Sequence, residues 1–134
     1  MGDMANLAIP DVLRKGKENI EGMILAPSWS SREGDLTFGT SAKNLWGGEV
    51  DWTTAMSYNA AKAIIKTLEE TPIRNSISKK LKDGIEIGGA SGEFHFQGDG
   101  SVNPSVYLVG VCKTREEESI AGYNFLPLEN CPSS

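Results

Sequence analysis

The stretch that most constrains the fold covers residues 50–70, VDWTTAMSYNAAKAIIKTLEE, which has the composition and spacing of a long helix. Asp51 is placed to act as the N-cap, because its carboxylate can accept the unpaired N–H groups of the first turn. Polar residues recur at spacings of three and four, and apolar residues fill the rest of the surface. An apolar arc of this width predicts a helix that is mostly buried against a sheet or several other elements.

Shorter helices are predicted on both sides of this stretch. One covers residues 9–20, and another covers Leu36–Trp46, which the glycine pair 47–48 would end. A third would take Thr71 as its N-cap and end at Gly84. The region after position 84 changes its period, so strands are expected from there on.

Three segments have the pattern of strands. Residues 22–29 (GMILAPSW) form a short apolar run that ends in a loop, and residues 93–96 alternate polar and apolar side chains. Residues 106–112 (VYLVGVC) form another apolar run. Because residues 97–105 are rich in turn formers, the last two runs are predicted to pair as a hairpin.

The chain has 134 residues, which is the length of one domain. Residues 1–112 are predicted to form a single α/β domain. Residues 113–134 show no strong period and are predicted to be a C-terminal extension or tail, either a short helix and strand or poorly ordered. The net charge of -5 argues against a nucleic-acid partner, which favours a basic face.

No apolar run reaches transmembrane length, and no signal peptide is visible at the N-terminus. With one histidine and no Cys-x-x-Cys pair, neither a metal site nor another cofactor is expected. Cys112 and Cys131 could form a disulfide in an oxidising compartment, but their spacing does not decide it.

No catalytic set is apparent, so the chain is not expected to be an enzyme. His95 alternates with two phenylalanines and is predicted to face the opposite side of its sheet, as a structural or solvent-facing side chain. The glycine-rich residues 88–92 precede a strand rather than a helix, so they are interpreted as a tight connection and not a phosphate site.

Three aromatic residues are more suggestive. Trp29 follows a predicted strand, Trp52 opens the long helix, and Tyr58 lies about two turns further on. Open α/β folds place small-ligand sites at such positions. The pattern alone leaves a second interpretation open, in which these rings belong to the core.

Several segments together resemble a known family. They are EGMILAPSW, LWGGEVDWTTAMSYNAAKAIIKTLEE and GASGEFHFQGDGSVNPSVYLVGV. They resemble the C-terminal part of type I periplasmic binding proteins, the branched-chain amino-acid and amide receptors of ABC transporters, in particular cyanobacterial ones. The family pattern W-x-x-A-x-x-Y-D-A stands here as Trp52, Ala55, Tyr58, Asn59 and Ala60. The match runs from about residue 21 to residue 111.

This resemblance implies an α/β fold, namely a fragment of the three-layer sandwich of one receptor lobe, with a C-terminal β-hairpin. It also implies a non-catalytic role, in which an amino acid or a similar small polar molecule binds in a cleft between two lobes. The candidate ligand-binding residues by position are Ser28, Trp29, Val50, Asp51, Trp52 and Tyr58.

The family chain is much longer, and the parts that hold a ligand's α-carboxylate and amine have no counterpart here. Asn59 also stands where the family has aspartate. A receptor fragment, a piece of a fused sensor and a truncated interaction module without a ligand therefore all remain open. Exposed strand edges and the apolar helix arc predict a homo-oligomer. The family also implies an ABC permease or a fused domain as a partner. The compartment of the family is periplasmic or extracellular.

Overall fold

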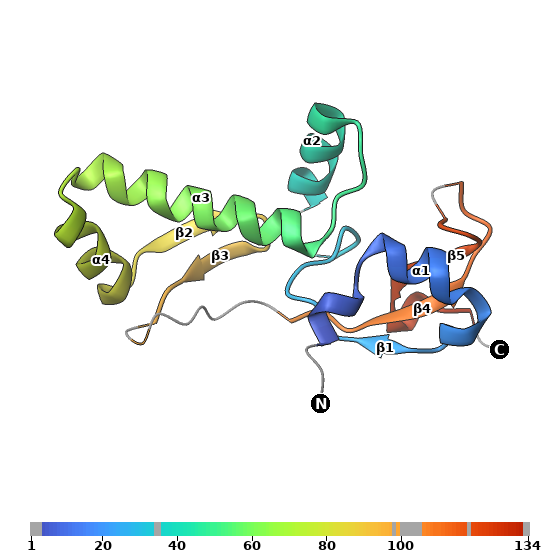
Figure 1. Ribbon diagram of the computed structural model, residues 1–134. Helices are drawn as coiled ribbons and strands as arrows, with labels where there is room; N and C mark the ends of the chain where they lie inside the picture. The colour runs from blue at the N-terminus through green and yellow to red at the C-terminus, as the bar shows by residue number, and fades with distance from the viewer. Residues whose placement is uncertain (1–3, 34–35, 98, 100–105, 118, 133–134) are drawn as a thin grey trace.

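In the computed structural model the chain forms an elongated molecule of two halves (Figure 1). The structure describes residues 4–33, 36–97, 99, 106–117 and 119–132. The helices are α1 (Pro10–Gly16), α2 (Leu36–Trp46), α3 (Trp52–Glu70) and α4 (Arg74–Asp83), with short 3-10 helices η1 (Met4–Leu7), η2 (Lys17–Ile20) and η3 (Leu128–Asn130). The strands are β1 (Ile24–Leu25), β2 (Glu86–Gly89), β3 (Gly92–His95), β4 (Val109–Lys113) and β5 (Tyr123–Pro127).

The first half, which we call the sheet half, contains α1 and an antiparallel sheet of order β1-β4-β5. Leu25 pairs with Val109 and Val109 pairs with Pro127, so β4 is the central strand. Helix α1 covers one face of this sheet, where Leu13 is fully buried against Val111 and Tyr123. Alternation along β4 and β5 therefore gives this half a core on the α1 side.

The C-terminal residues cover the other face of the sheet. A disulfide joins Cys112 on β4 to Cys131 just after η3. A Cβ atom on Gly110 would lie 2.9 Å from Cys131 Sγ and 3.1 Å from Leu128 Cδ2. Only glycine lets the C-terminal segment approach β4 this closely, so β4 is covered on both faces by its own chain, while Ile24 on the edge strand β1 stays 51% exposed.

The second half, the helical half, contains α2, α3, α4 and the hairpin of β2 and β3. The predicted N-cap of α3 is confirmed, since one carboxylate oxygen of Asp51 accepts bonds from Thr53 N at 3.0 Å and Thr54 N at 3.1 Å. One stripe of α3 is buried at every fourth residue: Ala55, Asn59, Ala63 and Thr67. These small side chains allow β2 and β3 to pack close to the helix axis.

The prediction that α3 is mostly buried is wrong. Ile64, Ile65 and Leu68 are 50%, 54% and 45% exposed on the side away from the hairpin. The reason is that a two-stranded hairpin covers only one face of a helix, and on the opposite side α2 lies only near the N-terminal end of α3, where Phe38 contacts Tyr58 (Figure 1).

The predicted pairing of the strands also needs correction. Residues 93–95 of the predicted strand lie in β3, but β3 pairs with β2, with Phe94 opposite Ile87. The glycine-rich residues 88–92 hold the end of β2 and the turn, so the connection there is part of a hairpin. A C-terminal hairpin is present, but it consists of β4 and β5 and not of the predicted pair of residues 93–96 and 106–112. Of the predicted turn at 97–105, positions 98 and 100–105 lie outside the described residues.

Helix bounds agree with the sequence where the stop signals are strong. Helix α2 runs over Leu36–Trp46 as predicted, and Gly47 follows it at a positive φ of 65°. The predicted helix over residues 9–20 is split into α1 and η2. Thr71 is not the N-cap of α4, because α4 begins at Arg74 and Thr71 instead accepts a bond from Ile73 N with its hydroxyl at 3.4 Å.

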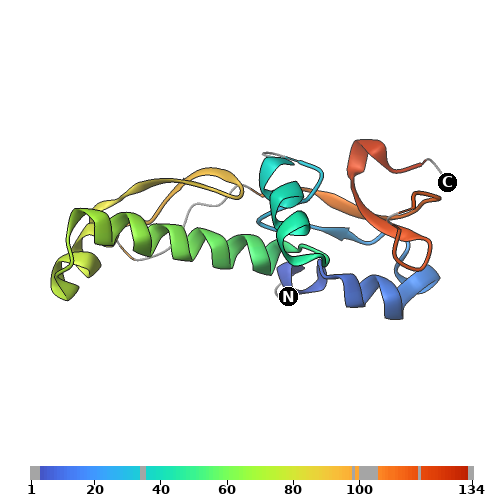
Figure 2. The same ribbon diagram turned by 90° about the horizontal axis from the view of Figure 1, so that it is seen from above.

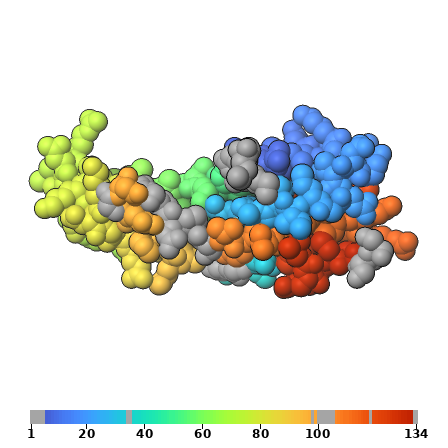
Figure 3. Space-filling view, turned by 90° about the horizontal axis from the view of Figure 1, so that it is seen from below, coloured from blue at the N-terminus to red at the C-terminus, as the bar shows by residue number. Residues whose placement is uncertain are grey.

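The helical half is an insertion in the sheet half, since residues 36–97 lie between β1 and β4 in the sequence. Figure 2 shows α2 beside the junction of the two halves, and Figure 3 shows the halves at opposite ends of the surface. The α/β class is confirmed. The division into a domain of residues 1–112 and an extension of 113–134 stays a prediction; within the extension, β5 pairs along the whole of β4. No helix in the described ranges is long and apolar enough to span a membrane.

Candidate functional site

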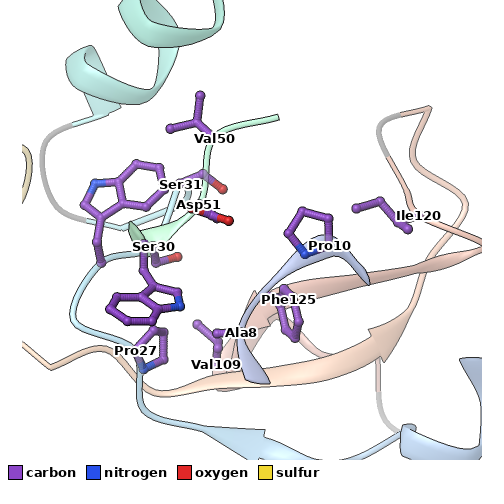
Figure 4. Close-up of a pocket in the computed structure, with 12 residues that line it drawn as sticks. Ala8, Pro10, Pro27, Ser30, Ser31, Val50, Asp51, Val109, Ile120 and Phe125 are labelled. Carbon is purple, nitrogen blue, oxygen red and sulfur yellow. The ribbon is translucent and has the colours of Figure 1, made fainter. Parts of the chain in front are cut away.

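A small pocket of about 70 Å³ lies where the two halves meet (Figure 4). Twelve residues line it: Ala8, Pro10, Pro27, Trp29, Ser30, Ser31, Val50, Asp51, Trp52, Val109, Ile120 and Phe125. In Figure 4, Val50, Asp51 and Ser31 lie on one side, and Pro10, Phe125 and Ile120 lie on the other. The pocket is therefore built from the start of α3 and the segment after β1 on one side, and from the sheet half on the other.

Trp52 is the side chain that connects the two cores. It packs against Leu25 and Val109 in the sheet half, and against Trp29 and Ala55 beside α3. Its indole nitrogen Nε1 is buried and has no hydrogen-bond partner among the described residues. A buried N–H group without an acceptor costs free energy, so Trp52, which lines the pocket, carries an unsatisfied donor.

Trp29 has a different role, because its indole is already bonded. Its Nε1 donates to the carbonyl oxygen of Ala90 at 3.1 Å, and Asn59 Oδ1 accepts from the amide of the same residue at 2.7 Å. Ala90 is fully buried. The segment after β1, the helix α3 and the β2–β3 turn are thus fixed together at one residue, Ala90, which sets the pocket wall next to Trp29.

The carboxylate of Asp51 serves α3. Besides the two backbone bonds of the cap, its Oδ1 accepts from the hydroxyls of Thr53 at 2.5 Å and Thr54 at 3.3 Å. A carboxylate oxygen with four donors of its own helix is engaged as a cap. Asp51 lines the pocket, but its bonds indicate a positioning role for the start of α3.

Two lining serines were not among the residues predicted from the sequence. Ser30 is buried and its hydroxyl oxygen accepts from Arg32 N at 3.3 Å, while Ser31 lies beside it at the pocket edge. The turn-rich, polar composition around Ser30 and Ser31 was the available signal. Because a turn does not fix where side chains point, the signal did not identify them individually.

The structure brings together Trp29, Val50, Asp51 and Trp52 of the predicted set, but not the other two. Ser28 contributes its carbonyl oxygen to a bond from Ser91 Oγ at 3.3 Å and does not line the pocket. The Tyr58 ring packs on Phe38 of α2, with ring centroids 4.8 Å apart. Tyr58 lies six residues after Trp52, which turns its ring to another side of the helix.

A wider cleft of about 770 Å³ opens beside the pocket and shares Pro10, Ser31, Val50 and Ile120 with it. Its edges carry ion pairs. Arg32 and Glu116 lie 2.5 Å apart, and Arg14 contacts Glu49 at 2.6 Å. The cleft is thus flanked by charges that neutralise one another, which does not favour a ligand of high net charge.

One carboxyl group near the cleft is perturbed. Glu33 follows Arg32, and its Oε2 atom is buried without a hydrogen-bond partner among the described residues. Burial raises the pKa of Glu33 first, and the negative charge of Glu129 raises it further. In the described part of the chain no group of three or more histidine, cysteine, aspartate or glutamate side chains could hold a metal ion. His95 is exposed on β3.

No model of a known protein family matches the chain, and no curated protein sequence does. Solved structures do match. A leucine-, isoleucine-, valine-, threonine- and alanine-binding protein from Brucella ovis, in a closed conformation, is similar with a TM-score of 0.76 and 15% identity, over 91% of this chain and 34% of that one. A leucine binding protein from Thermotoga maritima is similar with a TM-score of 0.70 and 20% identity, over 89% of this chain and 34% of that one.

A solute-binding protein of an ABC transporter from Rhodopseudomonas palustris, in complex with 3,4-dihydroxybenzoic acid, gives a TM-score of 0.65 at 14% identity, over 87% of this chain and 32% of that one. The chain spans about a third of the length of these proteins, 32–34%. Nearly all of the chain takes part in each match, so both halves belong to the same shared fold. The resemblance inferred from the motifs is confirmed at the level of the fold.

Proposed function

We propose, from the premise that the chain has the fold of part of an ABC-transporter substrate-binding protein, that it contributes one wall of a non-catalytic binding site for a small amino-acid-like or amide-like molecule. The observation that carries the proposal is the buried Trp52 Nε1 atom, a donor without an acceptor among the described residues, on a side chain that lines the pocket between the halves. The receptor would supply the remaining wall from residues beyond this chain's share of the fold.

The chemistry of the pocket supports this class of ligand. Its walls are aromatic and aliphatic, and its few polar groups converge from Ser30, Ser31 and Trp52. Small-ligand sites combine apolar walls with a small number of placed polar groups. A carbonyl or carboxylate oxygen would satisfy the indole N–H, and an aliphatic portion would fit against Val50 and Phe125. We expect binding without turnover.

The compartment and partners follow the same proposal. The disulfide between Cys112 and Cys131 is the kind of bond that persists in oxidising environments, which supports a periplasmic or extracellular location. In that compartment the chain would act with an ABC permease or as part of a fused sensor.

A second candidate function is an interaction module that self-associates and binds no ligand. The exposed apolar side chains of α3 favour it, because a contiguous apolar surface of this kind marks an interaction site. The two candidates differ in the surface that is used and in its partner. The first binds a small molecule in the pocket, and the second binds another protein on α3.

A thermal-shift screen against amino acids, short amides and urea tests the first candidate, since a ligand bound only by the folded state raises the Tm. The matched variants are Trp52→Phe, which removes the N–H but keeps an aromatic ring, and Trp46→Phe on the exposed end of α2. We expect one chemical class to raise the Tm, Trp52→Phe to abolish the rise and Trp46→Phe to keep it. The absence of a shift for every compound would favour the interaction module.

A further inference from the structure

We propose that a second copy of this chain covers the bare face of α3, in an antiparallel two-fold contact centred between Ile65 and Leu68. The proposal is independent of the ligand pocket, because the pocket lies at the N-terminal end of α3 and this face lies along its C-terminal half. It concerns the molecule that covers the exposed apolar face of α3 in the helical half.

The bare face has the spacing of a helix-pairing seam. Ala61, Ile65 and Leu68 follow one another at intervals of four and three residues, which is the a/d pattern of paired helices. We call these three residues the α3 seam. All three are exposed, with Ile65 at 54% and Leu68 at 45%, and Ile64 beside them is 50% exposed.

The seam points away from the chain's own core. Ala63 and Thr67 lie on the opposite side of α3 and are fully buried, with Ala63 packed against Ile87 and Phe94 of the hairpin. Within the described residues nothing else covers the seam, so its apolar side chains gain a partner only from another molecule. Burying such side chains is favourable at about 25 cal/mol per Å² of apolar surface.

Charges beside the seam select a second copy over an unrelated partner. Lys62 and Glu69 are seven residues apart, so they lie on the same flank of α3, two turns from each other. Neither forms an ion pair within the described chain; Lys62 Nζ lies 5.8 Å from the centroid of the Tyr58 ring. In an antiparallel two-fold pair, Lys62 of each copy meets Glu69 of the other, whereas in a parallel two-fold pair these flanks lie on opposite sides of the seam and the two residues do not meet.

The same arrangement fits the apolar residues. A two-fold axis between Ile65 and Leu68 places Ile65 of each copy against Leu68 of the other, and it places the small Ala61 just beyond the end of the other copy's α3 at Glu70. Because the contact is isologous, every favourable pair occurs twice. Lys62 of one copy and Glu69 of the other copy are then offset by about 3 Å along the helix direction, given a rise of about 1.5 Å per residue. This offset is within reach of these long side chains.

The size of the contact predicts its strength. From position 61 to the end of α3 at Glu70 the seam covers about 14 Å of helix at that rise, so the contact is at the small end of specific interfaces. We therefore expect a dimer whose population depends on protein concentration. Sedimentation equilibrium over a wide concentration series should give a weight-average mass that rises from monomer to dimer.

Four variants test the geometry. Leu68→Glu places a charge in the seam and should raise the dissociation constant by about tenfold or more, the effect expected of about 1.4 kcal/mol. Leu45→Glu, on the exposed side of α2 at 75% exposure, is the matched control and should leave the constant unchanged. Lys62→Glu should weaken the dimer, and the double variant Lys62→Glu with Glu69→Lys should restore it, because both pairs are reversed together. Circular dichroism checks that each variant stays folded.

Three results would overturn the proposal. The first is a wild-type chain that stays monomeric up to its solubility limit, which would indicate that α3 is covered by a different molecule, such as a chain carrying the rest of the receptor-like fold. The second is a dimer that Leu68→Glu leaves intact, which would place the contact elsewhere, for example in exchanged strands. The third is a charge reversal that fails to restore the dimer, which would exclude the antiparallel pairing.

Discussion

The two halves differ in how completely the chain covers its own apolar surface. In the sheet half, α1 covers one face of β4 and β5, and the disulfide segment covers the other. In the helical half, α3 has a packed stripe of small residues on one side and bare isoleucine and leucine on the other. The comparison teaches that burial depends on layers. The central strand β4, which has cover on both faces, is buried at positions 109–112, whereas a helix on a two-stranded hairpin keeps an exposed apolar face and needs another layer.

The largest expected effect tests this difference in the cores. Replacing the fully buried Leu13 by alanine removes contacts with Val111 and Tyr123 and should lower the free energy of unfolding by about 2–5 kcal/mol. The same truncation at Leu68 should change it by less than about 0.5 kcal/mol, because that side chain is exposed. Urea unfolding at low protein concentration measures both. Equal losses would show that α3 is covered and that the halves are alike.

The next effect sharpens the comparison at the disulfide. The bond between Cys112 and Cys131 closes a loop with a sequence separation of 19, for which about 3 kcal/mol of stabilisation is typical. A reductant should therefore lower the Tm of the wild-type chain. The double variant Cys112→Ser with Cys131→Ser should start at the lower Tm and not respond to the reductant. A wild-type Tm that does not change on reduction would show that the disulfide does not stabilise the sheet half.

A smaller effect concerns the bond that fixes the helical half to the junction. Asn59→Ala leaves the buried Ala90 amide without its acceptor, at a cost of about 1–3 kcal/mol. Asn75→Ala on the exposed surface of α4 is the control and should cost less than about 0.5 kcal/mol. The unfolding free energies in urea compare the two. A neutral Asn59→Ala would mean that the junction is held by Trp29 and Trp52 without this bond.

The smallest effect is a pH dependence near the cleft. The pKa of Glu33 is raised above its ordinary value of 4.5, so the folded state binds this proton more tightly than the unfolded state does. The stabilisation from this group is therefore present below pH 4.5, and it is lost as the pH rises through the raised pKa of the folded state. Glu33→Gln should reduce the change in Tm between about pH 5 and about pH 7. At about pH 7 the variant should be more stable than the wild-type chain. An unchanged pH profile would contradict the buried placement of this carboxyl group.

Local signals in the sequence were enough for some elements. The Asp51 cap and the bounds of α2 depend on residues within one or two turns, and both were predicted correctly. Strand β2 was missed because Gly88 and Gly89 break its alternation. A Cβ on Gly89 would overlap Asn59 Oδ1 and lie 2.7 Å from Phe94 Cε1, so this glycine is required by a neighbour that is distant in sequence.

The pocket shows the same limit. Trp29, Val50, Asp51 and Trp52 lie next to the ends of predicted elements, and those ends do meet. Ser28 and Tyr58 were placed by proximity in sequence, but the direction of their side chains is set by packing that periodicity does not contain. Likewise, the apolar period of α3 predicted its helical form correctly but did not show that the described residues leave Ile64, Ile65 and Leu68 exposed.

The insertion of the helical half between β1 and β4 has a consequence for the order of folding. Contacts between α3, α4 and the β2–β3 hairpin join neighbouring segments, whereas β1 meets β4 only after the intervening chain has become compact. Loop closure over a long, unstructured segment slows folding, and a structured insertion shortens the distance to be closed. We therefore expect pulse-labelled hydrogen exchange to protect the Ile87 amide before the Val109 amide. The exposed apolar face of α3 would then be present before the sheet is complete, which makes early self-association during refolding a competing reaction.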